Sequence, residues 1–362
     1  MKKILIFLCL NLFLYSNEYK IGVVLPLTGA SAAYGQSALN GIKLANSMQG
    51  SLDNGDKIVL SVVDTKGDKL ESYSSSLRLV SNEKVLGLIG EMLTANTLQV
   101  MRVAEEKEIP LIAPAATSDR ILDKKNFSSR VCFNDSFQGE SLAKYVFDKL
   151  NYKKVAIIMD QSADYSLGLA KAFENEFKKR GGDILNTFKI NSGDKDFKTL
   201  IAQLKNLNID FIYLPLYYNE AALFVRQARN LKLNTPMGSA DGVADKTFIN
   251  LTGDTSKGHI FTDSFDYNNP STDLAKEFIK NYKGQVPNFT AMGADAYFVM
   301  IRAMNNCLSN LSPKCINDEI HKTNFEGVTG KISIDKSGNA KRSVVIKEIN
   351  NQSQIYKDTI NP

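Results

Sequence analysis

Histidine is scarce in this sequence, whose 362 residues contain only His259 and His321. Neither lies beside a serine or cysteine in a nucleophile motif, and the chain has no GxSxG or HExxH string. No pair of carboxylates stands at the spacing of an acid–base catalyst. These absences argue against the common classes of hydrolase. They do not exclude an enzyme, because aspartate and glutamate can transfer protons unaided.

Cysteine is also rare, with four residues in the chain. Cys9 lies in an N-terminal segment that we expect to be removed. Cys307 and Cys315 enclose the loop-like residues 308–314, and in an oxidising compartment this spacing predicts a local disulfide. Cys132 is predicted as a buried thiol in a strand. No histidine or second cysteine stands at metal-ligand spacing from any of them, so we expect no metal site.

The chain lacks a strong excess of charge of either sign. Its formal charge is +5, and without Lys2 and Lys3 it becomes +3, from 42 basic and 39 acidic residues. The basic residues are scattered among acidic ones, without the stripe that a nucleic-acid groove requires. Hydrophobic content of 43% and charged content of 23% are ordinary for a globular protein. We therefore expect no nucleic-acid partner.

Residues 1–16 predict export. Lys2 and Lys3 form a positive start, residues 4–15 are apolar, and Ser16 is a small residue at the expected cleavage point. Such a segment is too short to span a bilayer and is typical of a cleaved signal peptide. A lipoprotein signal at Cys9 is the alternative, but bulky residues precede that cysteine. We expect a free periplasmic protein, since no later run is long enough for a transmembrane helix.

The rest of the chain alternates short apolar runs with amphipathic helical segments, which predicts parallel sheets covered by helices on both faces. Ten strands exceed what one twisted open sheet usually holds, so we expect two sheets. The predicted strands are residues 19–25, 57–63, 85–89, 110–113, 130–133, 155–159, 184–188, 211–214, 236–239 and 258–262. The fold class is therefore α/β, with two doubly wound parallel-sheet lobes joined by a multi-strand hinge.

Polar breaks divide the two series of strands. One lies at residues 134–136, before a helix predicted from residue 140, and another at 263–269. The residues after the second break are too few for a third lobe. We predict an N-terminal lobe of residues 17–135 plus 266–342 and a C-terminal lobe of residues 136–265 plus 343–362. Several crossings between lobes would restrict the hinge to one mode of opening.

Two loops predict a site for an anion. Thr94 follows the strand predicted at 85–89, and residues 115–117 follow the strand at 110–113. The carboxyl ends of parallel strands share one edge of the sheet, where ligands collect. Hydroxyls, backbone amides and a helix start can hold a carboxylate without cationic side chains. As an alternative, Thr94 is an ordinary N-cap.

Strand-end loops of the second series contribute a carboxylate and aromatic rings. Asp241 could neutralise an ammonium group, although Asp before Gly is also common in turns. Tyr165 and Tyr217 follow strands of this series and indicate an aromatic cleft. Tyr34 lies in the first loop, 26–35, which has neither a dinucleotide fingerprint nor a P-loop lysine. We therefore expect no cofactor.

These features together resemble the periplasmic leucine/isoleucine/valine-binding family, the type I substrate-binding proteins of ABC transporters. Their order and spacing extend over about 340 residues. The strings that carry the resemblance are Ile21-Gly22-Val23-Val24, Leu27-Thr28-Gly29, Tyr34-Gly35, Ala113-Pro114-Ala115-Ala116-Thr117, Lys195-Asp196-Phe197, Asp210-Phe211-Ile212-Tyr213, Tyr217-Tyr218 and Arg226-Gln227-Ala228-Arg229.

The resemblance implies a division of labour in the site. The α-carboxylate would bind the Thr94 hydroxyl and the Thr117 amide. The α-ammonium would bind the Ala115 carbonyl, the Thr117 hydroxyl and Asp241, which is one methylene shorter than the glutamate usual in the family. Tyr165 and Tyr217 would close over the ligand, and Tyr34 would flank its side chain.

Two departures from the family pattern concern the ligand. The shorter Asp241 could lengthen the ammonium contact or admit a water. Pro215-Leu216, where many relatives have glycines, would narrow the pocket beside Tyr217 or shift that tyrosine. We expect a monomeric, non-enzymatic protein that captures an aliphatic, branched-chain L-amino acid and delivers it to an inner-membrane ABC permease. The alternative is a sensor of another small amino acid or amide that reports to a membrane receptor.

Overall fold

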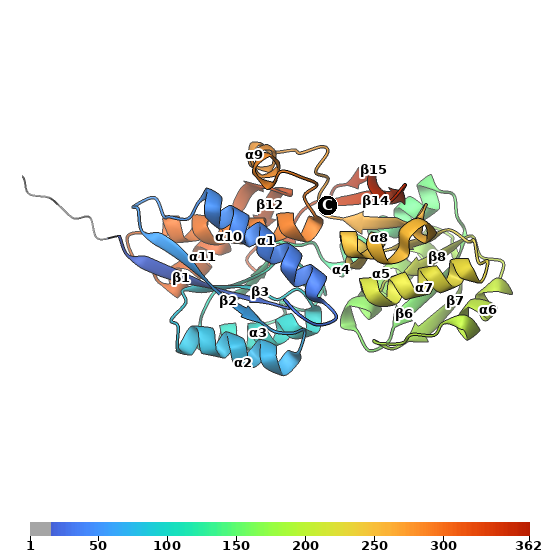
Figure 1. Ribbon diagram of the computed structural model, residues 1–362, viewed down its shortest axis with the longest axis horizontal. Coiled ribbons are helices and arrows are strands. Elements are labelled where there is room, and N and C mark those ends of the chain that lie inside the picture. Colours follow the sequence, from blue (N-terminus) through green and yellow to red (C-terminus); the bar gives the residue numbers. More distant parts are fainter. Residues whose placement is uncertain (1–15) are drawn as a thin grey trace, which may run out of the picture.

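A computed structural model describes residues 16–362, and the two sheets of the chain lie side by side in it (Figure 1). The predicted signal peptide, apart from Ser16, lies outside the described residues. Within residues 16–362, no helix is both long enough and apolar enough to cross a membrane.

The first lobe is built on a five-stranded parallel sheet of order β2-β1-β3-β4-β5. Helices α1 and α10 cover one face, and α2 and α3 cover the other. Both faces are buried, which explains the nearly continuous apolar strands. The strands are β1 (Glu18–Leu25), β2 (Lys57–Asp64), β3 (Gly87–Gly90), β4 (Leu111–Ala113) and β5 (Ser128–Arg130). The helices are α1 (Ala32–Met48), α2 (Lys69–Ser81), α3 (Thr94–Lys107), α10 (Asn288–Asn306) and α11 (Pro313–Ile320), which packs on α10.

The second lobe is built on a seven-stranded sheet of order β15-β14-β10-β9-β8-β6-β7. Helices α4 and α5 cover one face, and α6, α7 and α8 cover the other. The parallel strands are β6 (Lys154–Asp160), β7 (Asp183–Ile190), β8 (Phe211–Leu214), β9 (Met237–Ser239) and β10 (Ile260–Asp263). The antiparallel strands at one edge are β14 (Val344–Asn350) and β15 (Ser353–Ile360). The helices are α4 (Asp135–Lys144), α5 (Asp164–Lys179), α6 (Lys198–Lys205), α7 (Tyr218–Asn230) and α8 (Lys246–Thr252).

Smaller elements complete the chain. A three-stranded sheet and helix α9 lie beside the first lobe (Figure 1). These elements are α9 (Asp273–Tyr282), β11 (Asn324–Gly327), β12 (Gly330–Ile334) and β13 (Ala340–Lys341). Short 3-10 or π-helical turns are η1 (Tyr145–Lys149), η2 (Asp241–Val243) and η3 (Gly253–Ser256).

The predicted fold class is confirmed, with three local corrections. The strand predicted at 130–133 is wrong, because β5 ends at Arg130 and the buried Cys132 follows the strand. The helix predicted from residue 140 begins earlier, at Asp135, because the Asn134 side chain accepts a hydrogen bond from the Phe137 amide (2.9 Å) and caps it. The second sheet is mixed, since β14 and β15 run antiparallel at its edge.

The chain crosses between the sheets three times, and Arg342 ties the three crossings together. Arg342 lies on the crossing from β13 to β14. Its guanidinium donates to the Val131 carbonyl (2.8 Å), on the crossing from β5 to α4, and to the Ser264 carbonyl (2.9 Å), on the crossing from β10 to α9. Beside them, Asp263 and Lys347 form a buried ion pair (2.7 Å). The lobe boundaries predicted from the sequence stay a prediction.

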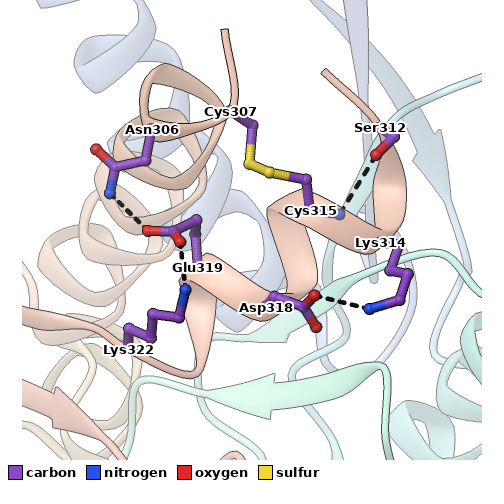
Figure 2. The surroundings of a disulfide bond; sticks show 8 residues. All are labelled: Asn306, Cys307, Ser312, Lys314, Cys315, Asp318, Glu319 and Lys322. Atoms are coloured by element: carbon purple, nitrogen blue, oxygen red, sulfur yellow. Dashed lines mark hydrogen bonds and ion pairs between the residues drawn. A yellow bond between two sulfur atoms is a disulfide. The ribbon is translucent and has the colours of Figure 1, made fainter. Parts of the chain in front are cut away.

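The predicted disulfide joins Cys307 and Cys315, whose Cα atoms are 6.0 Å apart. Figure 2 shows it linking the end of α10 to the first turn of α11, where the Ser312 side chain caps the helix by accepting from the Cys315 amide. The segment expected to be a loop therefore ends in a helix. The disulfide therefore links α10 and α11 of the first lobe covalently.

Candidate ligand site between the lobes

The first lobe supplies the start of helix α3 to the site. Thr94 is the first residue of the helix, and Leu93 is the N-cap, whose side chain cannot accept a hydrogen bond. The alternative that Thr94 is the N-cap is therefore wrong. Buried Glu91 accepts from the Met92 amide (2.9 Å) and the Leu93 amide (3.0 Å), and it also accepts from the Thr65 hydroxyl (2.6 Å). The loop is thus fixed, and the first amides of α3 point along the helix axis towards the site.

The loop after β4 lies beside this helix start. Ala115 lines the cavity described below, and Thr117 is 1% exposed. Among residues 16–362, the Thr117 hydroxyl has no hydrogen-bond partner. Arg130 holds the loop, because its guanidinium donates to the carbonyls of Ala116 (3.2 Å) and Ser118 (2.8 Å). Arg130 therefore holds this wall in place through backbone carbonyls, and it is not among the residues that line the cavity.

The second lobe supplies Asp241, the first residue of η2, directly after β9. Its side chain is buried, and Oδ1 accepts a hydrogen bond from the Tyr165 hydroxyl (2.9 Å). The Asp241 amide donates to the Gln138 Oε1 (2.7 Å), and the same oxygen accepts from the Thr262 hydroxyl. Burial raises the pKa of Asp241 to about 6, although the bond from Tyr165 opposes the rise. The network aims the carboxylate across the cleft.

Aromatic rings from both lobes close the site. Tyr165 and Tyr217 stack with their centroids 4.7 Å apart, and Tyr34 of the first lobe meets Tyr217 edge-on at 6.0 Å. The Tyr34 hydroxyl donates to the Gly242 carbonyl (2.6 Å) and accepts from the Tyr218 amide (3.2 Å). These hydrogen bonds join the lobes, so the structure represents a closed form.

A second set of interlobe hydrogen bonds lies at the rim. The Tyr218 hydroxyl (2.5 Å) and the Asn219 side-chain amide (2.8 Å) both donate to the Ala30 carbonyl. Ala30 belongs to the loop before α1, and Tyr218 and Asn219 begin α7. Both sets join the region around the start of α1 to the start of α7, and the first set also reaches η2.

A cavity lies where these groups of the two lobes meet. Six of the seven predicted ligand-binding residues line it, and they are Tyr34, Thr94, Ala115, Tyr165, Tyr217 and Asp241. The seventh, Thr117, is buried and does not line the cavity. Sequence reasoning missed four lining residues, and they are Met92, Leu93, Gly242 and Phe289. Phe289 is remote in sequence, and its ring meets that of Tyr34 edge-on at 5.0 Å. Leu216, expected to narrow the pocket, is buried in the core instead.

Sequence reasoning also missed a second buried carboxylate. Asp135 is 0% exposed, and within residues 16–362 neither of its oxygens has a hydrogen-bond partner. Burial raises its pKa well above the usual range, the charge of Asp241 raises it further, and the nearby Thr117 hydroxyl lowers it. The Asn134-Asp135-Ser136 string resembles an ordinary helix start, so nothing in the sequence marks this carboxylate as part of the site.

One histidine has a hydroxyl partner that the sequence pattern did not reveal. His259 Nε2 lies 2.9 Å from the Ser239 Oγ, but both residues are buried and neither lines the cavity. Burial lowers the pKa of His259 to about 3, so the imidazole is neutral. Within residues 16–362, no three His, Cys, Asp or Glu side chains are grouped to hold a metal ion.

Comparison with known proteins gives one family. Its sequence model, described as periplasmic binding protein, matches residues 18–354. The Leu/Ile/Val-binding protein of Citrobacter freundii is 30% identical over 344 residues, which cover 92% of this chain and 91% of that protein. The Leu/Ile/Val/Thr-binding protein of Salmonella typhimurium is 31% identical over 74% of this chain and 75% of its own length.

Solved structures that resemble this chain belong to proteins with similar names. A leucine binding protein from Thermotoga maritima is 35% identical, with a TM-score of 0.91 over 95% of this chain and 99% of that one. The branched-chain amino acid transporter substrate binding protein LivJ from Streptococcus pneumoniae, in complex with isoleucine, is 29% identical. Its TM-score is 0.90 over 96% of this chain and 100% of that one.

Proposed function

This chain belongs to the periplasmic binding protein family, and we propose that it captures leucine, isoleucine or valine between its lobes and delivers the amino acid to an ABC permease. The observation that carries the proposal is the closed cavity. It combines a helix start and hydroxyls from one lobe with a buried carboxylate from the other. Relatives that bind these amino acids match nearly the whole chain.

The polar half of the cavity suits a zwitterion. The α-carboxylate accepts from the Thr94 hydroxyl, the start of α3 and the Thr117 amide, all of them neutral donors. The α-ammonium donates to the Ala115 carbonyl, the Thr117 hydroxyl and Asp241. The unpartnered Thr117 hydroxyl supports this assignment, because a buried polar atom without a hydrogen bond is costly.

The other half of the cavity suits an aliphatic side chain. Tyr34, Met92, Tyr217 and Phe289 line it with rings and a thioether, and no Lys or Arg among residues 16–362 lines the cavity. A charged ligand side chain would lose its hydration without gaining a partner. Burial of a leucine, isoleucine or valine side chain contributes roughly 1.5–3 kcal/mol.

Binding without turnover follows from the same arrangement. In this proposal the polar groups of the cavity serve to hold the ammonium and the carboxylate of the ligand. Lobe closure links capture to delivery, because only the closed form presents both lobes to a permease in one fixed arrangement. The mature chain acts as a monomer in the periplasm after removal of residues 1–16.

A thermal-shift screen of the mature chain over the twenty amino acids tests the proposal. A ligand at 100 times its Kd stabilises the folded state by about 2.7 kcal/mol. Leucine, isoleucine or valine should raise the melting temperature, whereas lysine and glutamate should not. A rise with another solute and none with these three amino acids would refute the ligand assignment.

The variant Asp241→Ala tests the role of the carboxylate. Calorimetry should detect no binding of L-leucine by this variant, because the ammonium would lose its only anionic partner in the lining. The matched control is Asp123→Asn, which removes an exposed carboxylate that pairs with Arg120 on the outer surface. Its affinity should equal that of the wild type. Retained affinity in Asp241→Ala would remove Asp241 from the site.

A further inference from the structure

Two buried aspartates lie together where the lobes meet. Asp135 and Gln138 are one turn apart in α4 and therefore share a face of the helix. Gln138 touches the Asp241 backbone through the 2.7 Å hydrogen bond, so this face of α4 packs against Asp241. Asp135 is 0% and Asp241 is 3% exposed. The closed form thus buries two carboxylates in one region, and one of them, Asp241, lines the cavity between the lobes.

No cation among residues 16–362 is bonded to either carboxylate. Arg130 donates to loop carbonyls, Arg342 donates to the hinge carbonyls, and Lys347 pairs with Asp263. The charge of Arg130 lowers the pKa of Asp135, whereas the charge of Asp263 raises the pKa of Asp241. The remaining titratable groups near the pair add negative charge or none, and they are Asp119, Cys132, Tyr34, Tyr165, Tyr213 and Tyr217. The Tyr165 hydroxyl donates to Asp241, and the Thr117 hydroxyl lies near Asp135 and lowers its pKa.

Burial of two like charges has a direct energetic consequence. A carboxylate that leaves water without a partner is penalised, and a neighbouring carboxylate increases the penalty. The pKa values of both groups are accordingly raised in the closed form. Opening of the lobes returns water to Asp241, which lines the cavity between them. The closed form is therefore favoured either by protons or by a cationic group that neutralises the pair.

We propose that Asp135 and Asp241 form a charge gate, which lets the lobes close at neutral pH only on a ligand that carries a cationic group. The inference rests on the proposed function and adds a rule of selection to it. A carboxylate with the same aliphatic side chain but no ammonium fits the anion-binding half of the cavity, yet it leaves the charge gate unneutralised. The two unneutralised carboxylates therefore oppose closure of the lobes on such a ligand. They oppose closure without any ligand for the same reason.

The experiment compares L-leucine with 4-methylpentanoate, which is leucine without its ammonium group. Calorimetry measures binding, and small-angle scattering measures closure, for the wild type, Asp135→Asn, the double variant Asp135→Asn/Asp241→Asn and the control Asp123→Asn. At pH 7.5 the wild type should bind and close on leucine only. The double variant should lose roughly 30-fold or more in leucine affinity and gain binding of 4-methylpentanoate. Asp135→Asn should shift the preference in the same direction, and the control should match the wild type.

A pH series gives a second readout that does not depend on variants. The closed form holds protons on the charge gate to a higher pH than the open form does. Closure of the lobes without a cationic ligand therefore takes up protons, and a lower pH favours it. Binding of 4-methylpentanoate by the wild type should strengthen between pH 7.5 and pH 5.5, whereas the double variant should show a weaker dependence.

The outcomes separate the gate from the proposed function. A wild type that closes on 4-methylpentanoate as readily as on leucine at pH 7.5 would overturn the gate and leave the proposed function intact. The gate would also be overturned by a double variant that no longer binds leucine and does not bind 4-methylpentanoate at either pH. Circular dichroism would have to show that this variant keeps its fold. A wild type that binds no amino acid would overturn both proposals.

Discussion

The Tyr34 hydroxyl offers a clean test of how closure contributes to affinity. It donates to the Gly242 carbonyl and accepts from the Tyr218 amide, and both partners belong to the opposite lobe. The variant Tyr34→Phe removes only the hydroxyl. Its ring keeps the edge-on contacts with Phe289 and Tyr218, whose centroids lie 5.0 and 4.9 Å away.

The expected loss follows from the state in which these hydrogen bonds form. In the open form, water satisfies the Tyr218 amide and the Gly242 carbonyl. In the closed form of the variant, both groups are buried without this partner. Two hydrogen bonds lost in this way amount to about 1–3 kcal/mol, which weakens ligand binding about 5- to 150-fold. Ligand-free stability should change less, because the open form never makes these bonds.

Calorimetry with the preferred amino acid measures the change in Kd, and stopped-flow fluorescence measures the dissociation rate. The loss should lie mainly in faster dissociation, since the hydroxyl acts after closure. The control is Tyr282→Phe, whose ring stacks on Phe278 away from the cavity. An unchanged Kd in Tyr34→Phe would refute the claim that these interlobe bonds stabilise the liganded state.

Three further predictions concern stability. Arg342→Met removes the hydrogen bonds that join the three crossings and should lower the free energy of unfolding by about 3 kcal/mol or more, with two separated transitions in calorimetry; a single unshifted transition would contradict its role. Replacing Cys307 and Cys315 by serine opens a short loop and should cost about 2–3 kcal/mol in urea unfolding, with leucine affinity unchanged because the bond is remote from the cavity. His259 has a folded pKa of about 3 and an unfolded pKa near 6.5, so the unfolded chain takes up a proton first and stability falls as the pH drops below about 6.5. In urea unfolding, this histidine should lower the free energy of unfolding by about 2 kcal/mol between pH 7.5 and pH 5. The control His259→Gln should lack this decrease.

The sequence predicts the strands well because parallel strands buried on both faces are nearly continuous apolar runs. Its errors lie where polar side chains decide the local structure. Asn134 starts α4 five residues earlier than its apolar pattern indicates, because its side chain accepts from the Phe137 amide. The antiparallel β15 was not predicted at all, since its exposed edge position leaves it few apolar residues.

For the site, chain order predicts the strand-end loops but not what folds against them. Thr94, Ala115 and Asp241 follow strands, so a sheet edge brings them together. Phe289 comes from α10 and Tyr218 from α7, and only packing places both beside Tyr34. Asp135 follows no strand and resembles a helix-start residue. Its burial beside Asp241 depends on how the two lobes close, which no local pattern records.

The most direct test of the central claim is a crystal structure of the mature chain grown with L-leucine. We expect one leucine between the lobes, with its carboxylate on Thr94 and the Thr117 amide, its ammonium on Asp241 and its side chain against Phe289. A leucine bound outside the cavity, or one with its carboxylate turned towards Asp241, would contradict it.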